Sequence, residues 1–120
     1  MKVAVSSVGE TLDSAVDPRF GRAAQFVLVD TDTGEHQLIS NAQNLNAAQG
    51  AGIQSAEAVA RLGAKALVTG HCGPKAFRVL LAAGIKIYNT DARTVAEALE
   101  HYRAGKLKEA ESADVEGHWV

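Results

Sequence analysis

The chain is poor in cysteine and in aromatic residues. Cys72 is the single cysteine among 120 residues, which excludes an internal disulfide and a site built from several thiolates of one chain, and which agrees with a reducing compartment. Aromatic residues make up 5% of the sequence, whereas hydrophobic residues of all kinds make up 47%. Small aliphatic side chains supply most of this apolar content, as is typical of helices packed on a sheet. We expect a single α/β domain.

An excess of positive charge is also missing. The formal net charge is -2, which argues against a general nucleic-acid binder, because phosphate backbones are held mainly by surplus Lys and Arg. Long apolar runs are absent as well. The opening strand turns polar at Ser6 and Ser7, too early for a signal peptide or a membrane span. We therefore expect a cytoplasmic protein that binds neither nucleic acid nor membrane.

Three strands are predicted in the first third of the chain. Residues 2–6 form the first strand, and residues 7–21 lack periodicity and form a loop. Residues 24–30 are nearly all apolar, as in a central strand. Residues 32–34, Asp-Thr-Gly, have the chemistry of a hairpin turn because glycine adopts positive φ easily, so residues 35–40 should pair antiparallel with the second strand.

Helices and strands alternate after a polar connection. Apolar residues at helical spacing predict helices, and short apolar runs predict strands. The predicted elements are a helix over 53–62, a strand over 65–69, a helix over 74–83, a strand over 85–89 and a helix that starts at a Thr94–Glu97 capping box and stops at Gly105. The expected order is βββαβαβα.

These connections require a mixed sheet. Strand-helix-strand units need parallel pairing with right-handed crossovers, whereas a tight hairpin needs antiparallel pairing. We expect a five-stranded mixed sheet with helices on both faces. Ligands of such sheets collect beyond the carboxyl ends of strands, where the connections change direction. The loops after the first and fourth strands both begin at such ends, so they share one rim if these strands are parallel neighbours.

These two loops carry the candidate binding residues. We call residues 17–22, Asp-Pro-Arg-Phe-Gly-Arg, the arginine loop, and residues 70–75, Gly-His-Cys-Gly-Pro-Lys, the cysteine loop. The candidate contacts to a bound cofactor in them are Arg19, Phe20, Gly21, Arg22, Gly73 and Lys75, and the candidate metal ligands are His71 and Cys72. Together the loops predict an anion pocket.

The arginine loop has two interpretations. Arg19 and Arg22 can hold an anion through planar, permanently charged guanidinium groups. Alternatively, they pair at the surface with Asp13 or Asp17, an arrangement that contributes only about 0 to 1 kcal/mol. Phe20, which lies between them, fits a core or loop anchor better than a ligand contact.

The cysteine loop lies at a predicted helix N-terminus, where backbone N–H groups attract anions. There Cys72 would be favoured as a thiolate, a soft ligand for copper or molybdenum, unless it is a small buried hydrophobe. His71 either ligates metal or hydrogen-bonds the turn. Lys75 in the first helical turn opposes the helix dipole, a local cost that a bound anion would relieve.

The polar connection over residues 41–52 contains Asn46 and Gln49. It is either an ordinary loop or a cover whose amides and N–H groups close over a ligand that must enter and leave. In the first case Asn46 and Gln49 are surface residues, and in the second they are further cofactor contacts.

The same segments resemble the nitrogenase iron-molybdenum cofactor biosynthesis family, which contains the dinitrogenase cofactor carriers. The resemblance spans about the first 105 residues and is carried by Phe-Gly-Arg-Ala at 20–23 and by Gly-Pro at 73–74, in this order after the first and fourth strands. Within the family, the chain is most similar to small stand-alone members of anaerobes, including one of sulfate reducers that carries a molybdenum-copper sulfide cluster.

The resemblance implies a ribonuclease H-like carrier domain over residues 1–105, and the charged residues over 106–120 predict a tail after it. It further implies carriage of a preformed anionic metal-sulfur cluster, molybdenum-copper sulfide or a related molybdenum or iron-sulfur cluster, without catalysis. A partner ATPase or acceptor protein is expected by the same resemblance. Carriers often have His before Phe-Gly, where this chain has Arg19, so a permanent cation replaces a ligating imidazole. This difference favours electrostatic holding of a thiometallate.

Other functions and states stay open. Cys-His catalysis needs a geometry that adjacent turn residues rarely provide, and nuclease chemistry needs carboxylates on strand centres, which are almost absent here. A regulatory or scaffolding module with a vestigial site would instead show a closed or uncharged rim. The tail, which ends in His118-Trp119-Val120, is either solvated or docked, and the protein is either a monomer or a weak dimer.

Overall fold

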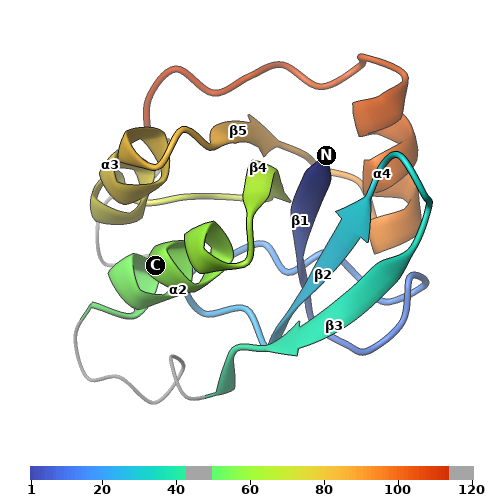
Figure 1. Ribbon diagram of the computed structural model, residues 1–120, viewed down its shortest axis with the longest axis horizontal. Helices are drawn as coiled ribbons and strands as arrows, with labels where there is room; N and C mark the ends of the chain where they lie inside the picture. Colours follow the sequence, from blue (N-terminus) through green and yellow to red (C-terminus); the bar gives the residue numbers. More distant parts are fainter. Residues whose placement is uncertain (43–49, 114–120) are drawn as a thin grey trace.

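The computed structural model describes residues 1–42 and 50–113 (Figure 1). The predicted contacts Asn46 and Gln49, and the aromatic end at 118–120, lie outside these residues. The strands are β1 (Lys2–Ser7), β2 (Gln25–Asp30), β3 (His36–Ser40), β4 (Ala64–Thr69) and β5 (Lys86–Asn89). The helices are α2 (Ala51–Arg61), α3 (Pro74–Ala82) and α4 (Val95–Arg103).

The strands form one mixed sheet in the order β3-β2-β1-β4-β5. β2 pairs antiparallel with β1, and it pairs antiparallel with β3 because the Asp-Thr-Gly hairpin turns the chain back on itself. β1 pairs parallel with β4, and β4 pairs parallel with β5. The structure thus confirms the five-stranded mixed sheet, and each predicted strand matches an observed one to within one residue at either end.

Each face of the sheet packs against helices. Strand side chains alternate between two buried clusters, so Ala4 and Leu67 face one side whereas Val5 and Val68 face the other. α2 and α3 cover the first face, and α4 covers the second (Figure 1). The helices therefore lie on both faces of the sheet, and the two buried clusters between the sheet and the helices form the core.

Helix ends follow their sequence signals. Thr94 is the N-cap of α4, and its hydroxyl oxygen accepts the backbone N–H of Glu97 at 3.1 Å. Gly63 and Gly84 lie one residue past the C-caps of α2 and α3, with φ of 83° and 78°, which non-glycine residues adopt only with strain. The described residues include no helix that is long and apolar enough to cross a membrane.

The segment after α4 lies against the edge of the sheet (Figure 1). We call residues 106–113 the C-terminal strap. The backbone N–H of Ala110 donates to the carbonyl of Ile87 in β5 at 2.7 Å, and Glu109 forms a bridge with Tyr88. Leu107 packs against the α4 side, whereas Ala110 and Ala113 pack against the other side. The strap therefore closes the edge of β5.

Candidate functional site

The arginine loop and the cysteine loop meet at the carboxyl ends of β1 and β4. Arg19 and His71 form a parallel bridge, and the backbone N–H of Phe20 donates to the carbonyl of His71 at 3.1 Å. Gly70 lies directly against Pro18. The two loops therefore share one rim, as the parallel pairing of β1 with β4 predicts.

The start of the arginine loop is tied to the end of β1. The backbone N–H of Asp17 donates to the carbonyl of Ser6 at 2.9 Å. The Asp17 carboxylate accepts the backbone N–H of Arg19 at 3.0 Å, which turns the chain so that the next residue reaches His71. Asp17 thus stabilises the loop backbone at the point where the two loops join.

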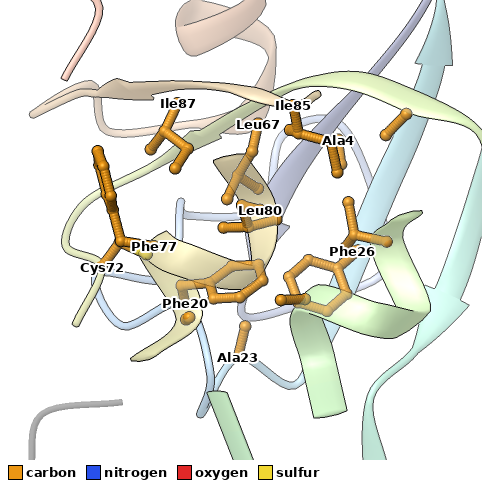
Figure 2. Packing of buried hydrophobic residues seen from close by; sticks show 14 of the residues in the cluster. Ala4, Phe20, Ala23, Phe26, Leu67, Cys72, Phe77, Leu80, Ile85 and Ile87 are labelled. Carbon is orange, nitrogen blue, oxygen red and sulfur yellow. The ribbon is translucent and has the colours of Figure 1, made fainter. Parts of the chain in front are cut away.

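Phe20 and Gly21 face the protein interior. The Phe20 side chain is 0% exposed, and its ring lies 5.3 Å from that of Phe26 between centroids at an interplanar angle of 40° (Figure 2). The carbonyl of Gly21 accepts the hydroxyl of Ser55 in α2 at 3.4 Å. The structure thus places Phe20 in the core as the anchor of the loop, where its ring has no surface to offer a ligand.

The charged side chains of the two loops lie at the surface. Arg19 and Lys75 are exposed, and Arg22 and His71 are half-buried. Among residues 1–42 and 50–113, Arg19 takes part in no ion pair within 4 Å, since the ion pairs found there join the N-terminal amine to Asp30 and Asp32. Arg19 therefore forms no ion pair with Asp17, and its guanidinium group is available to an anion.

Two helix N-termini lie at the same end of the sheet as the loops. α2 runs into the start of β4 and α3 leaves from its end, so both helices begin at the carboxyl edge. Gly50 and Gly73 are the N-caps, neither provides a side-chain cap, and neither helix has an acidic residue in its first turn. The N–H groups at these ends carry partial positive charge. The rim is thus electropositive in a chain whose net charge is -2.

Cys72 lies in the hydrophobic core. It is 1% exposed and belongs to the cluster that contains Phe77 and Leu80 (Figure 2). Its thiol donates to the carbonyl of Gly73 at 3.7 Å. Within the described residues, no group of three or more His, Cys, Asp or Glu side chains could hold a metal ion. The position of Cys72 fits the small buried hydrophobe rather than an exposed thiolate.

A shallow hollow of about 420 Å³ borders the cysteine loop on the side of β5. His71 lies on its wall, and the strap contributes Lys106 and Lys108. Asp91 adds one carboxylate, and Asn89 fixes the wall because its side-chain amide donates to the carbonyl of Gly70 at 3.0 Å. The strap thus brings two further cations close to the rim.

Sequence reasoning did not single out the polar residues beneath the rim. Ser6 and Thr69 are both 0% exposed and directly follow the apolar runs of β1 and β4, near the carboxyl ends of these strands. The available signal was a hydroxyl residue at the same end of each of the two strands that precede the candidate loops. That signal becomes visible only when the two strands are known to be parallel neighbours.

The fold is that of a small α/β protein with two paired loops at one edge of its sheet, and comparison with known proteins gives its family. The model of the dinitrogenase iron-molybdenum cofactor family matches residues 1–105. An uncharacterized protein of Methanocaldococcus jannaschii is 30% identical over 115 residues, which cover 92% of this chain and 97% of that protein. The chain belongs to the dinitrogenase iron-molybdenum cofactor family.

Two solved structures are similar over nearly the whole chain. The apo form of the orange protein from Desulfovibrio gigas is 41% identical with a TM-score of 0.93, over 95% of this chain and 96% of that one. A NifB-like protein from Thermotoga, solved by NMR, is 34% identical with a TM-score of 0.84, over 97% of this chain and 98% of that one. The family and these neighbours support a role as a carrier of a metal cluster or cofactor.

Proposed function

We propose that this protein binds a preformed anionic metal-sulfur cluster at the rim formed by the arginine and cysteine loops, and carries it without chemical change. The observation that supports this most is the Arg19–His71 bridge, because it places the cations of one loop beside the helix N-terminus of the other. The family and the similarity to the orange protein favour the same function. The cluster is the cargo of the protein.

The chemistry of the rim suits a sulfide-rich anion. Guanidinium groups are weakly hydrated, permanently charged donors, so Arg19 and Arg22 would hold terminal sulfides by charge-assisted hydrogen bonds. Lys75 and the N–H of Gly73 at the start of α3 would add charge and a backbone donor. Asn46 and Gln49 are proposed to cover the cluster from the connection before α2.

Direct coordination of the cluster metals by protein side chains contributes less to this proposal than electrostatic contacts do. His71 is half-buried at the junction of the loops and would be the accessible ligand for a copper ion of the cluster. Cys72 would have to leave the core before its sulfur could reach a metal, and breaking core packing is costly. We therefore propose that electrostatic contacts, and not a thiolate, hold most of the cargo. Molybdenum-copper sulfide is the proposed composition.

The remaining features agree with a carrier. The exposed position of Arg19 speaks against a vestigial, uncharged rim. With only β2 reversed, the strand order β3-β2-β1-β4-β5 supports a ribonuclease H-like topology, yet the sheet lacks the carboxylates of a nuclease: β1 and β4 contain no acidic residue. We propose a cytoplasmic carrier that exchanges its cargo with an acceptor protein or a partner ATPase.

Reconstitution tests this function. The apo protein is mixed without oxygen with tetrathiomolybdate and copper(I), separated from unbound metal by gel filtration and scanned in the visible range. We expect a charge-transfer band that elutes with the protein, and a rise in melting temperature because the cargo binds the folded state. A colourless protein with an unchanged melting temperature contradicts the proposal.

A further inference from the structure

Two buried hydroxyl groups join β1 to β4 beneath the rim. Val5 and Val68 are the last residue pair in register between these parallel strands, and Ser6 and Thr69 follow them directly. The two hydroxyl oxygens lie 2.8 Å apart, and both side chains are 0% exposed. Ser6 and Thr69 therefore form a hydrogen-bonded pair that water does not reach.

The direction of these hydrogen bonds follows from their partners. The Ser6 hydroxyl donates to the carbonyl of Asp17 at 2.8 Å, and a carbonyl can only accept. A serine hydroxyl has a single proton, so the proton shared between Ser6 and Thr69 must come from Thr69. The resulting chain runs from the Thr69 hydroxyl to the Ser6 hydroxyl and then to the Asp17 carbonyl, and it crosses from β4 to β1 to the arginine loop.

Ser6 holds both backbone polar groups of Asp17, the N–H and the carbonyl. Ser6 accepts the Asp17 N–H through its backbone carbonyl at 2.9 Å, and it donates to the Asp17 carbonyl through its side chain. From there the Asp17 carboxylate fixes the N–H of Arg19, and the next N–H, that of Phe20, reaches His71. Hydrogen bonds through Asp17 and the short backbone segment from Asp17 to Phe20 thus connect the buried pair to the meeting point of the loops.

Core packing alone gives no reason for hydroxyl groups at these positions. Burying a hydroxyl is unfavourable unless it is hydrogen-bonded, and the residues that directly precede the pair, Val5 and Val68, are aliphatic. In the described part of the chain, no buried side-chain N or O atom lacks a partner. The pair is therefore fully satisfied, and what it adds beyond a valine pair is a directed link to the arginine loop.

We infer that Ser6 and Thr69 are positioning residues, which hold the arginine loop in register with the cysteine loop through the Asp17 carbonyl. Neither residue contacts the cargo. The consequence for cargo binding rests on the proposed function, but the positioning of the loop does not, because the bonds are present in the protein without cargo.

The first test uses the apo protein and a matched pair of variants. Ser6→Ala removes the donor to Asp17. Ser7→Ala removes an equally buried hydroxyl from the next residue, which donates to the carbonyl of Gly9 and accepts its N–H. We expect amide hydrogen exchange at Phe20 to be about tenfold faster in Ser6→Ala than in Ser7→Ala, with amides in the middle of β2 as the reference for global unfolding. Equal rates at Phe20 would overturn the inference.

Variants of Thr69 test the direction of the hydrogen bond between Thr69 and Ser6. Thr69→Val keeps the shape but removes the proton that Ser6 accepts, and the bond from Ser6 to Asp17 survives. Exchange at Phe20 should therefore lie between wild type and Ser6→Ala. Thr69→Ser restores a hydroxyl and should return the rate toward wild type. The assigned direction is wrong if exchange at Phe20 is faster in Thr69→Val than in Ser6→Ala, or if Thr69→Ser does not restore the rate.

The second test measures the dissociation of cargo from protein reconstituted with tetrathiomolybdate and copper(I). Ser6→Ala should release the cargo about tenfold faster than Ser7→Ala, and Thr69→Ser should match wild type. Faster exchange at Phe20 with unchanged release would overturn the link between loop position and binding. Wild-type protein that takes up no cargo would overturn the proposed function, and the exchange rates of the apo protein would still decide the positioning role.

Discussion

Gly70 lies so close to Pro18 that an added Cβ atom would stand 2.7 Å from the Cα atom and 2.8 Å from the carbonyl oxygen of that proline. Both are backbone atoms, which no rotamer change can move aside. The contact joins the first residue of the cysteine loop to the second residue of the arginine loop. A side chain at residue 70 would therefore force the backbones of the two loops apart.

The first prediction is that Gly70→Ala separates the loops. Overpacking against a backbone should lower the free energy of unfolding by about 1 to 3 kcal/mol and should reduce retention of the reconstituted cargo. Gly84→Ala is the control, because residue 84 has φ of 78° and nothing within 4 Å of an added Cβ. It should cost about 1 to 2 kcal/mol through backbone strain, yet retain cargo like wild type. Equal retention in both variants would contradict this role of Gly70.

The second prediction is that the charges of the arginine loop contribute more to cargo binding than the Cys72 thiol does. Removing two guanidinium donors in Arg19→Ala/Arg22→Ala should weaken cargo binding at least about tenfold, measured by equilibrium dialysis of molybdenum. Cys72→Ser should leave affinity nearly unchanged, because the thiol is buried in the core, although a new hydroxyl there should lower the melting temperature. The reverse ranking would establish coordination by the Cys72 thiolate.

A charge-matched control belongs with that experiment. Arg61 and Arg103 lie in the last turns of α2 and α4, at the opposite end of the sheet from the loops. Arg61→Ala/Arg103→Ala changes the net charge by the same amount as the double variant of the arginine loop. Its affinity for the cargo should stay near that of wild type, and an equal loss would show that binding depends only on overall charge.

The third prediction concerns the C-terminal strap. Ala110→Pro removes the N–H that donates to Ile87 at 2.7 Å, so the edge of β5 should open and offer unpaired backbone groups to a second molecule. We expect a lower melting temperature and a molecular mass that rises with concentration in light scattering. Ala110→Ser keeps the N–H and should behave as wild type. A proline variant with the same molecular mass and the same melting temperature as wild type would show that the strap does not close this edge.

The fourth prediction is a pH dependence at Tyr102. Burial raises the pKa of its hydroxyl above the ordinary value of about 10, and the nearby Tyr88, whose ring centroid lies 5.2 Å away, adds to this rise. Because the folded state binds this proton more tightly, the resulting stabilisation is complete below about pH 10 and is lost as the pH rises through the higher folded-state pKa.

Absorbance at 295 nm measures this ionisation. The difference between the titrations of wild type and Tyr102→Phe isolates Tyr102 from the other tyrosine. Its midpoint in the folded protein should be higher than in urea, and Tyr102→Phe should lose less stability than wild type between about pH 10 and the folded-state midpoint. A midpoint equal to that in urea would contradict the assignment.

The sheet could be predicted from the sequence because its signals are local. The turn chemistry of residues 32–34 indicates the hairpin, and helical spacing of apolar residues indicates the two crossovers that make β4 and β5 parallel to β1. The meeting of the two loops follows from that topology alone, since both leave the carboxyl ends of neighbouring parallel strands.

The positions of individual side chains could not be predicted in the same way. A helix N-terminus next to Cys72 suggests an activated thiol, but the direction in which the side chain points depends on packing against Phe77 and Leu80. The need for glycine at residue 70 depends on where Pro18 lies, which is a contact between distant segments. The strap has no apolar periodicity and is held by a backbone bond at Ala110, so its sequence resembles that of a solvated tail.

Elemental analysis of protein purified without oxygen from cells supplied with molybdate and copper tests the central claim most directly. We expect molybdenum, copper and acid-labile sulfide in a fixed ratio to the wild-type chain, and a loss of all three in Arg19→Ala/Arg22→Ala at unchanged fold. Wild-type protein that is free of these elements, both as purified and after incubation with tetrathiomolybdate and copper(I), would contradict the account.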